Sequence, residues 1–531
     1  MKTIAHFNLP VHTNSLYEKE AISSISLTKE VADKINELVD AYNEFSKTDL
    51  EWKQTQEGTI RKGILYMKDN LINTLYDLLK IYDRETIKQI MSEAYGLEFD
   101  KMAELLNHIN VIVTPQMFGA VGDGVTNDTE AIEKAISSLH EGDVLHFPTG
   151  RYLMVGKAVD VATANITFSG NGLILCDYGF RLKASNFKAT GMRMESTYYS
   201  QDCRAFMIDN ATASGAAPTY LENFSFQDCH FKNFFYSVCA VGGAYNHDGT
   251  ESAIGYPVRD VVVENCYSTT HRDKNAGHFQ CIQVENISYI NNRTYGGQNA
   301  SSYNAIKGNG YIRVVGNYDH NNSYASCEIE NGSGNAVIAN NTFHSKIWID
   351  DSFSAVVNGN TTDDGILITV GSNTGNAENV VVSNNNCRNI RCEQFGDYVG
   401  GIINNINIVG NNVKGTNTHG IWLHGNAVKR AKVSNNFISG SNTNDIAIQR
   451  NAQLDCVISG NYGNGKLMLI AGTGGKVYAF DNYNVTSSGT RDPLPASHLE
   501  RSFNGLRVAD SSNVEWRIGV NTSGEVITTK Y

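Results

Sequence analysis

Three acidic residues stand in two strand-like segments at spacings that could bring their carboxyl groups together. Glu328 and Glu330 flank Ile329, and Asp350 directly follows Ile349. Side chains alternate along a strand, so an inward-facing Ile at both positions turns the three acids outward. Neighbouring parallel strands lie about 4.8 Å apart, which makes Glu330 and Asp350 stacked neighbours and Glu328 and Asp350 diagonal ones. Carboxyl groups this close resist joint ionisation, so one pKa should rise and suit an acid/base pair.

The spacing fits polysaccharide cleavage. Glycosidases hold two carboxyl groups about 5 to 5.5 Å apart for retention and about 6.5 to 9.5 Å apart for inversion, and both ranges are reachable here. We therefore predict Glu328, Glu330 and Asp350 as the catalytic residues. Large aromatic side chains on an outer face can stack on sugar rings. The predicted substrate-binding residues are Lys307, Trp348, Trp422, His424 and Arg391.

Two alternatives compete with this interpretation. Outward strand positions in a solenoid are commonly polar, so the acids could be solvated surface offset by Lys307. A register slip of one residue would also turn the whole set inward.

The elements that must position these residues are repeats of one short pattern, an alternating apolar strand followed by a turn and a second strand. The steps between repeats are 20 to 26 residues. A unit this short cannot bury its own apolar face, so the repeats must stack as a solenoid. The pattern predicts a right-handed parallel β-helix over 155–489. The Asn markers of the repeats are Asn265, Asn291, Asn317, Asn340, Asn360, Asn385, Asn411, Asn435 and Asn461.

A second column of apolar residues should point into the core. Two segments, 371–379 and 387–398, are expected as loops inserted beside the acidic face, and loops on one face of a solenoid often form its binding site. Earlier excursions at 244–260 and 271–278 bring further His and acidic residues to neighbouring turns. The predicted inward residues are Ile282, Ile306, Ile329, Ile349, Ile368, Ile402, Leu423, Ile448 and Leu469.

Composition limits the classes of partner. The chain has 531 residues and a formal net charge of -12, which argues against a nucleic-acid groove. No run of about 18 apolar residues is present, and the N-terminus lacks a basic region followed by an apolar core, so we expect a soluble protein without membrane insertion or an ordinary export signal. The 10 Cys show no metal-binding spacing. We expect reduced, structural cysteines.

The two ends differ from the repeats. Residues 1–112 show apolar residues at spacings of three and four with few Gly or Pro, which predicts a helical stem. The stem is either a coiled coil that ties several chains together or a pair of packed helices. Residues 490–531 leave the repeat and predict a small β module. On the residues alone, this module is a simple end cap of the solenoid.

The block 118–154, FGAVGDGVTNDTEAIEKAISSLHEGDVLHFPTGRYLM, carries a specific resemblance. It resembles the N-terminal signature of the pectate-lyase superfamily of right-handed β-helices, which includes polysaccharide-degrading enzymes and bacteriophage tail spikes. Asn127 and Glu130 are spaced as a capping box, and an apolar face follows on the helix. We therefore expect a capping block over 113–154 that closes the solenoid.

The resemblance implies a phage tail spike or appendage that binds a host surface polysaccharide or teichoic acid and cleaves it as a hydrolase or lyase. The alternatives are a non-catalytic adhesin of the virion and a cellular polysaccharide lyase or hydrolase. The implied state is a homotrimer joined to other tail proteins by the stem, made in the bacterial host cytoplasm and acting at the host cell surface. For residues 490–531 the resemblance implies a trimerisation cap or folding aid. No cofactor is expected. The alternative is Ca²⁺, because calcium-dependent pectate lyases combine Asp residues with an Arg base, and Arg391 stands close to Asp397.

Overall fold

The computed structural model describes most of the chain from residue 112 onward, as two compact units. The described part of the first unit comprises 112–122, Asp128–Pro148 and Thr163–Ser169. The stem expected over 1–112 lies outside the described residues, apart from Ile112. The described residues are 112–197, 203–209, 220–242, 258–269, 277–282, 284–297, 299–304, 310–321, 324–330, 334–371, 376–394, 401–415, 419–424, 428–440, 444–449, 455–463, 468–470, 477–485, 491–493, 506–509, 515–520 and 526–530.

The first unit carries the expected helix. Helix α5 (Thr129–Ser137) buries the apolar face predicted for it and packs against the 3-10 helix η2 (Pro115–Phe118). The unit also holds β1 (Ile112–Val113), β3 (Val144–Phe147) and β6 (Ile166–Gly170), of which β1 and β3 pair in parallel.

The predicted capping residue of this helix is wrong by one position. The N-cap is Asp128, because Asn127 is still the last residue of strand β2 (Asp123–Asn127). The Asp128 carboxylate accepts hydrogen bonds from the backbone N–H groups of Val121 at 2.7 Å and Gly122 at 3.2 Å. It therefore fixes the glycine-rich turn rather than the first turn of the helix.

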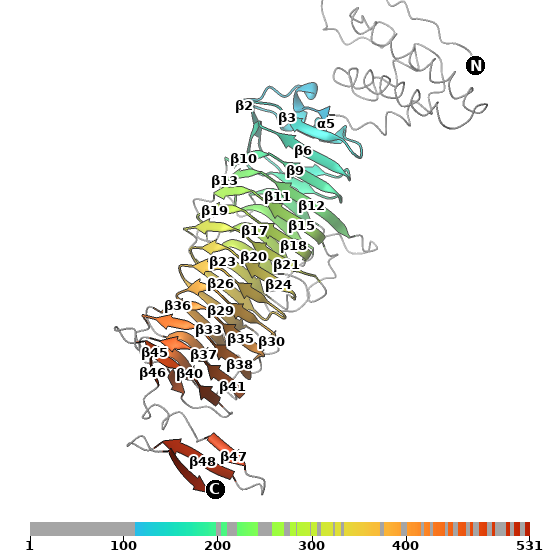
Figure 1. Ribbon diagram of the computed structural model, residues 1–531. Helices are drawn as coiled ribbons and strands as arrows, with labels where there is room; N and C mark the ends of the chain where they lie inside the picture. Colours follow the sequence, from blue (N-terminus) through green and yellow to red (C-terminus); the bar gives the residue numbers. More distant parts are fainter. Residues whose placement is uncertain are drawn as a thin grey trace, which may run out of the picture. The chain divides into compact units, whose positions relative to one another are not determined.

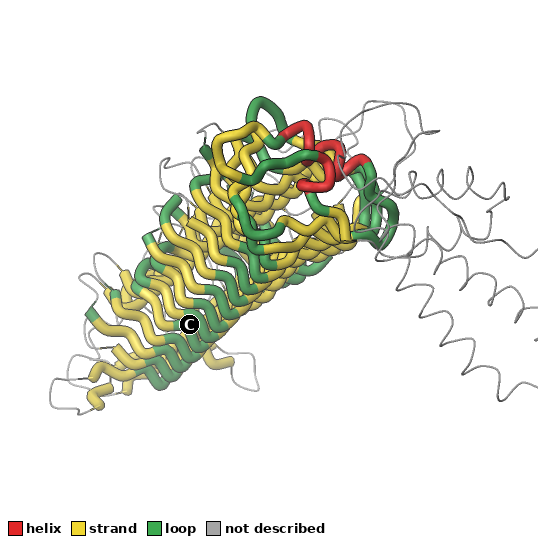
Figure 2. The backbone as a smooth tube through the Cα atoms, turned by 90° about the horizontal axis from the view of Figure 1, so that it is seen from above, coloured by secondary structure: helices red, strands yellow, loops and turns green. Residues whose placement is uncertain are grey.

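The second unit is the predicted parallel β-helix, in which each turn of the chain adds one strand to each of three sheets (Figure 1). Seen from above, strands alternate with loops around each turn (Figure 2). Within this unit, sheet A contains β9 (Phe187–Thr190), β12 (Leu221–Gln227), β15 (Val258–Glu264), β18 (Val284–Ile290), β21 (Ile312–Val315), β24 (Ala336–Ala339), β27 (Val356–Asn358), β31 (Val381–Ser383), β35 (Ile406–Val409), β38 (Arg430–Ser434), β41 (Asp455–Ser459) and β44 (Val477–Phe480).

Sheet B starts with β2 and ends with the antiparallel strand β46 (Arg491–Pro493). Between them lie β4 (Arg151–Met154), β7 (Leu173–Cys176), β10 (Arg193–Ser196), β13 (His230–Lys232), β16 (Tyr267–Thr269), β19 (Arg293–Tyr295), β22 (Tyr318–His320), β25 (Thr342–Phe343), β28 (Thr361–Thr362), β32 (Asn386–Cys387), β36 (Asn412–Lys414), β39 (Phe437–Ser439), β42 (Tyr462–Gly463) and β45 (Tyr483–Val485).

Sheet C carries the residues predicted for catalysis. A short parallel pair, β30 (Asn376–Glu378) and β34 (Ile402–Asn404), stands apart from the three sheets. The strands of sheet C are β5 (Val159–Val161), β8 (Phe180–Leu182), β11 (Arg204–Asp209), β14 (Tyr236–Val241), β17 (Gly277–Ile282), β20 (Asn299–Asn304), β23 (Ala325–Glu330), β26 (Lys346–Asp350), β29 (Gly365–Val370), β33 (Asn389–Gln394), β37 (His419–His424), β40 (Asn444–Gln449) and β43 (Met468–Ile470).

The corner between sheets A and B is built from two adjacent residues with different tasks. The first has a positive φ, which Gly and Asn tolerate best. It is Asn at four of the predicted markers, Asn265, Asn291, Asn340 and Asn435, with φ of 54 to 56°. The second is a buried Asn of a continuous ladder, which includes the other five markers. The ladder residues are Asn292, Asn317, Asn341, Asn360, Asn385, Asn411, Asn436, Asn461 and Asn482.

Each ladder residue is bonded to the next turn of the solenoid. Its side-chain Nδ2 donates to the Oδ1 of the following ladder residue at 2.8 to 3.1 Å. The same Oδ1 also accepts the backbone N–H of the donor residue, as between Asn360 and Asn385 at 2.9 Å. Buried amides must find partners, and this ladder satisfies them turn after turn.

The predicted core column of sheet C is confirmed over its central turns. Ile329, Ile349, Ile368, Leu423 and Ile448 are fully buried, and Cys392 occupies the turn between Ile368 and Leu423. Their alignment fixes which side chains of these strands face outward.

Three members of the predicted column are wrong, and Ile306 lies outside the described residues. At β17 the buried residue is Cys281, whereas Ile282 is aligned outward with Asn304. At β43 Ile470, rather than Leu469, aligns with Ile448.

Ile402 belongs to β34 and not to sheet C. The segment 387–398, expected as a loop, contains a strand of sheet C, so the residue that follows Ile368 in the column is Cys392. Strand β33, in the middle of 387–398, supplies the residue that was missing from the column. Of the two segments expected as loops beside the acidic face, this one is therefore mostly strand.

All ten cysteines are buried and free, in agreement with structural thiols. The C-terminal segment contains a three-stranded antiparallel sheet of β47 (Leu506–Ala509), β48 (Glu515–Val520) and β49 (Val526–Lys530), as the predicted small β module requires. Among the described residues, the structure has no helix of the length and apolarity needed to cross a membrane.

A candidate active site on sheet C

The outward side chains of sheet C form two columns across β23, β26, β29, β33 and β37. Strand pairing places Glu328, Trp348, Leu367, Arg391 and Trp422 in one column. The second column aligns Asp350, Thr369, Glu393 and His424, and Glu330 follows Ile329 in the same alternation. The structure thus brings the three predicted catalytic carboxyl groups onto two adjacent strands.

Glu328 is the most buried of the three acids, with 5% of its surface exposed. Burial is the largest cause that raises its pKa to about 9, followed by the charge of Glu330 and a hydrogen bond with the Glu330 side chain. A carboxyl group with this pKa keeps its proton at neutral pH. It can therefore donate a proton to a leaving group.

Asp350 lies one strand further along and is held from two sides. The Thr369 hydroxyl donates a short hydrogen bond to Oδ1 of Asp350, and the backbone of Gly371 contributes another. Burial is nevertheless the largest effect and raises the Asp350 pKa to about 7. Space at Gly371 is tight, because a Cβ there would stand 2.4 Å from Oδ2 of Asp350. Only glycine leaves room for the carboxylate in this position.

Lys346 is a member of the site that the sequence prediction missed. Its ammonium lies 4.1 Å from the ring centroid of Tyr324 and 4.7 Å from that of Trp348. Burial lowers the pKa of Lys346, while its charge lowers that of Glu328. Strand alternation could have revealed it, because Lys346, Trp348 and Asp350 are successive outward residues of β26.

Trp348 does not have the exposed position expected for a sugar-stacking ring. It is only 7% exposed, and Tyr324 packs against it with ring centroids 5.4 Å apart. Its Nε1 donates a hydrogen bond to the Thr369 hydroxyl at 2.7 Å, and that hydroxyl in turn donates to Asp350. The covering ring and cation exclude solvent, so Trp348 positions the acidic residues instead of presenting a free face.

A second cluster follows on β33 and β37. The Arg391 guanidinium lies over the ring of Trp422, 4.9 Å from its centroid, and pairs with Glu393 at 2.7 Å. The ring centroid of Trp422 lies 4.6 Å from that of His424 and 5.4 Å from that of His419. The structure thus brings three of the predicted binding residues together, with Trp422 in contact with both Arg391 and His424.

The cluster contains two buried nitrogen donors, Trp422 Nε1 and Arg391 Nε. Within the described residues, neither Trp422 Nε1 nor Arg391 Nε has a hydrogen-bond partner. Buried donors are normally paired, so these two N–H groups are exceptions within the described part of the chain.

Other predicted site residues lie elsewhere. Lys307 and most of the excursions at 244–260 and 271–278 fall outside the described residues. His278 is described and is buried, with Nδ1 2.6 Å from the Ser268 hydroxyl and Nε2 2.8 Å from the carbonyl of Gly296. Burial lowers its pKa to about 4. This histidine is therefore a neutral structural residue.

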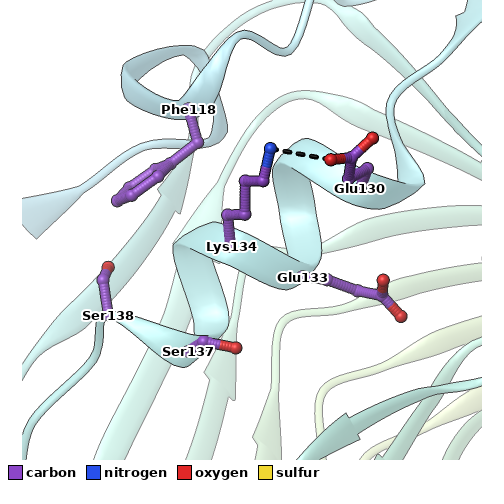
Figure 3. A pocket seen from close by; sticks show the side chains of 6 residues that line it. All are labelled: Phe118, Glu130, Glu133, Lys134, Ser137 and Ser138. Carbon is purple, nitrogen blue, oxygen red and sulfur yellow. Dashed lines mark ion pairs between the residues drawn. The ribbon is translucent and has the colours of Figure 1, made fainter.

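A hollow on helix α5 provides a contrast with the sheet C site. Phe118 and Ser138 contribute to its wall, and Lys134 pairs with Glu130 at 2.7 Å (Figure 3). Glu133 points away from that pair (Figure 3). The hollow therefore lacks converging acids. No group of three or more His, Cys, Asp or Glu side chains in the described part of the chain is arranged to hold a metal ion.

The family model described as rhamnogalacturonase A/epimerase, pectate lyase-like, matches residues 112–345. The chain is 24% identical over 302 residues to the pre-neck appendage protein of Bacillus phage B103, covering 52% of this chain and 32% of that protein. It is 23% identical over 361 residues to the pre-neck appendage protein of Bacillus phage phi29, covering 61% and 36%. The chain thus spans about a third of the length of these relatives.

Among solved structures, the surface adhesin PfbA of Streptococcus pneumoniae is similar at 15% identity and a TM-score of 0.41, covering 70% of this chain and 100% of that one. The resemblance expected from 118–154 is confirmed by the family match. Residues 112–345 are thus similar to the pectate lyase-like family, and the chain is similar to the pre-neck appendage proteins of phages.

Proposed function

We propose that this chain belongs to a phage tail appendage and that its sheet C face binds and cleaves a polysaccharide of the host cell surface. The observation that carries the proposal is the placement of Glu328, Glu330 and Asp350 on two adjacent strands beside Lys346. A pectate lyase-like domain and similarity to phage appendage proteins support the polysaccharide and the virion, respectively.

The two shifted acids divide the chemistry between them. Glu328, with a pKa of about 9, is protonated at neutral pH and serves as the general acid for the glycosidic oxygen. Asp350, with a pKa of about 7, is ionised above neutrality and activates a water or attacks the sugar. Between pH 7 and 9 the pair therefore has one proton and one charge, as hydrolysis requires.

The cluster of Arg391, Trp422 and His424 extends the same face by two strands, and we assign it to binding of the glycan. Its aromatic rings suit the apolar faces of sugars, and the guanidinium of Arg391 suits sugar oxygen atoms. The remaining parts of the proposal are a homotrimeric assembly, attachment to the tail through residues 1–112, and action at the host surface. Sedimentation of the whole chain and of a version without that segment tests the first, and incorporation of the shortened chain into virions tests the second.

The reaction is tested by incubating the purified chain with glycans isolated from the host envelope. New reducing ends support hydrolysis, whereas unsaturated products support a lyase. Glu328→Gln and Asp350→Asn should each lower the rate by about 100- to 10,000-fold. The matched control is Glu195→Gln, which changes a carboxylate of sheet B paired with Lys232 and should leave the rate unchanged.

A non-catalytic adhesin remains the second candidate, because the Arg391 and Trp422 cluster binds without needing the acids. Measurable glycan binding with no products after long incubation would select the adhesin and refute the catalytic assignment. Binding that is lost in Trp422→Ala but kept in Glu328→Gln would then locate the receptor site.

A further inference from the structure

Sheet B carries a continuous line of aromatic side chains on its outer face, away from the acids of sheet C. Six rings on β13, β16, β19 and β22 and just after β25 make up this line, which we call the aromatic stripe. Neighbouring ring centroids are 5.3 to 6.5 Å apart. The stripe consists of His230, Tyr267, Tyr295, Tyr318, His320 and His344.

The stripe follows from strand register. His230, Tyr267, Arg293 and Tyr318 share one outward column, and Tyr295 and His320 share the next. Tyr267 is 37% exposed and Tyr318 is 39% exposed, so their rings remain accessible. Solvent-facing sheet surfaces usually carry polar side chains, so a line of accessible aromatic rings of this length is unusual.

We infer that the aromatic stripe is a second glycan-binding site, which holds a linear polysaccharide along the axis of the solenoid. Consecutive turns lie about 4.8 Å apart, a spacing similar to the length of one sugar residue in an extended chain. Rings presented at each turn can therefore stack on successive sugars. The Tyr hydroxyls and His nitrogens at the ring edges supply hydrogen bonds to sugar hydroxyl groups.

The charges around the stripe agree with this ligand. Arg293 is exposed between Tyr267 and Tyr318 and offers five N–H donors to sugar oxygens or to an acidic substituent. Two acids beside the stripe are paired, since Asp363 lies 3.2 Å from the His344 ring nitrogen and Glu195 holds Lys232 at 2.8 Å.

The composition of this face argues against a contact between copies of the chain. Thr269, Thr342 and Lys232 are interleaved with the rings, and Lys232 is held by Glu195 at 2.8 Å. Permanent subunit interfaces are more apolar and are depleted in Lys at their centre. A glycan, which presents hydroxyl groups and apolar ring faces together, matches the mixture better.

This inference rests on the proposed function only for the class of ligand, a polysaccharide. An experiment can therefore refute the stripe as a binding site without refuting the proposed reaction, and the reverse. Binding is measured with host cell-wall polysaccharide in the Glu328→Gln background, which stops turnover. Tyr267→Ala and Tyr318→Ala should each weaken binding by about 3- to 10-fold. The matched control is Phe437→Ala, an aromatic that is 44% exposed on the same sheet but outside the stripe. It should leave the affinity unchanged.

Chain length separates the stripe from the catalytic face. With Glu328 intact, cleavage of an oligosaccharide of a few sugars should be unaffected by Tyr267→Ala and Tyr318→Ala, because it is too short to reach both sites. Unchanged affinity for the long polysaccharide in both Tyr variants would overturn the inference. Dissociation of the assembly in sedimentation would also overturn it, by making the stripe a subunit interface. Absence of any cleavage would refute the proposed reaction and leave the stripe standing if binding still depends on the two Tyr.

Discussion

Replacing Glu328 by Gln should make the fold more stable while it removes the general acid. In the folded chain the Glu328 pKa is about 9, against an ordinary value of 4.5. A raised pKa contributes stability that is fully present below 4.5 and is lost as the pH rises through 9. At pH 7 the loss is about 3 to 4 kcal/mol, from about 1.4 kcal/mol per pH unit over the roughly 2.5 units between 4.5 and 7. Gln does not ionise, and its amide N–H can still donate to Glu330. The variant should therefore escape most of this loss.

The signature is a pH dependence rather than a single value. We expect the difference in melting temperature between Glu328→Gln and the wild type to grow from pH 5 through pH 7 to pH 9, measured by scanning calorimetry. Glu195→Gln reports the effect of removing a carboxylate from sheet B under the same conditions. A constant difference across this range, or a variant that loses stability relative to the wild type at pH 9, would show that Glu328 is not held protonated by its surroundings.

Three further outcomes follow from the site and the ladder. A profile of kcat/KM against pH should rise near 7 as Asp350 ionises and fall near 9 as Glu328 ionises; a flat profile would contradict the acid/base pair. Thr369→Val removes a hydrogen bond that lowers the Asp350 pKa, so the acidic limb should move to higher pH, whereas Thr369→Ser should keep it in place. Asn385→Ala should lower the free energy of unfolding by about 2 to 4 kcal/mol in urea titrations, because it leaves buried partners unsatisfied. Asn412→Ala, at a position outside the ladder, should lower the free energy of unfolding by less. Equal decreases in the two variants would contradict a special stabilising role of the ladder.

The fold was predictable because its rules are local. Alternating branched residues identify strands, and a repeat too short for its own core implies stacking. The same local rules did not identify the corner residue where two neighbouring Asn residues were both suitable. In Asn291-Asn292 either residue could mark the corner, and only the backbone shows that the first adopts positive φ while the second joins the ladder. The turn containing β33 was missed because its outward Arg391 and Glu393 made the segment resemble a loop.

The positions of the acidic residues were predictable from strand alternation, but their burial and their pKa values were not. Alternation places Glu328 and Asp350 on one side of adjacent strands once Ile329 and Ile349 are assigned to the core. Burial of Trp348 could not be predicted, because Tyr324, which covers it, precedes β23 and reaches it only through the folded turn. The pKa values depend on that cover as well, since burial is the largest cause of both shifts.

The asparagine ladder has a consequence for how such a protein can diversify. Consecutive ladder residues are separated by as few as 19 and as many as 26 positions, yet their amides meet at nearly the same distance. Differences in turn length are therefore absorbed away from this corner. Segments between the sheets can be exchanged, lengthened or shortened during evolution while the asparagine ladder keeps its geometry.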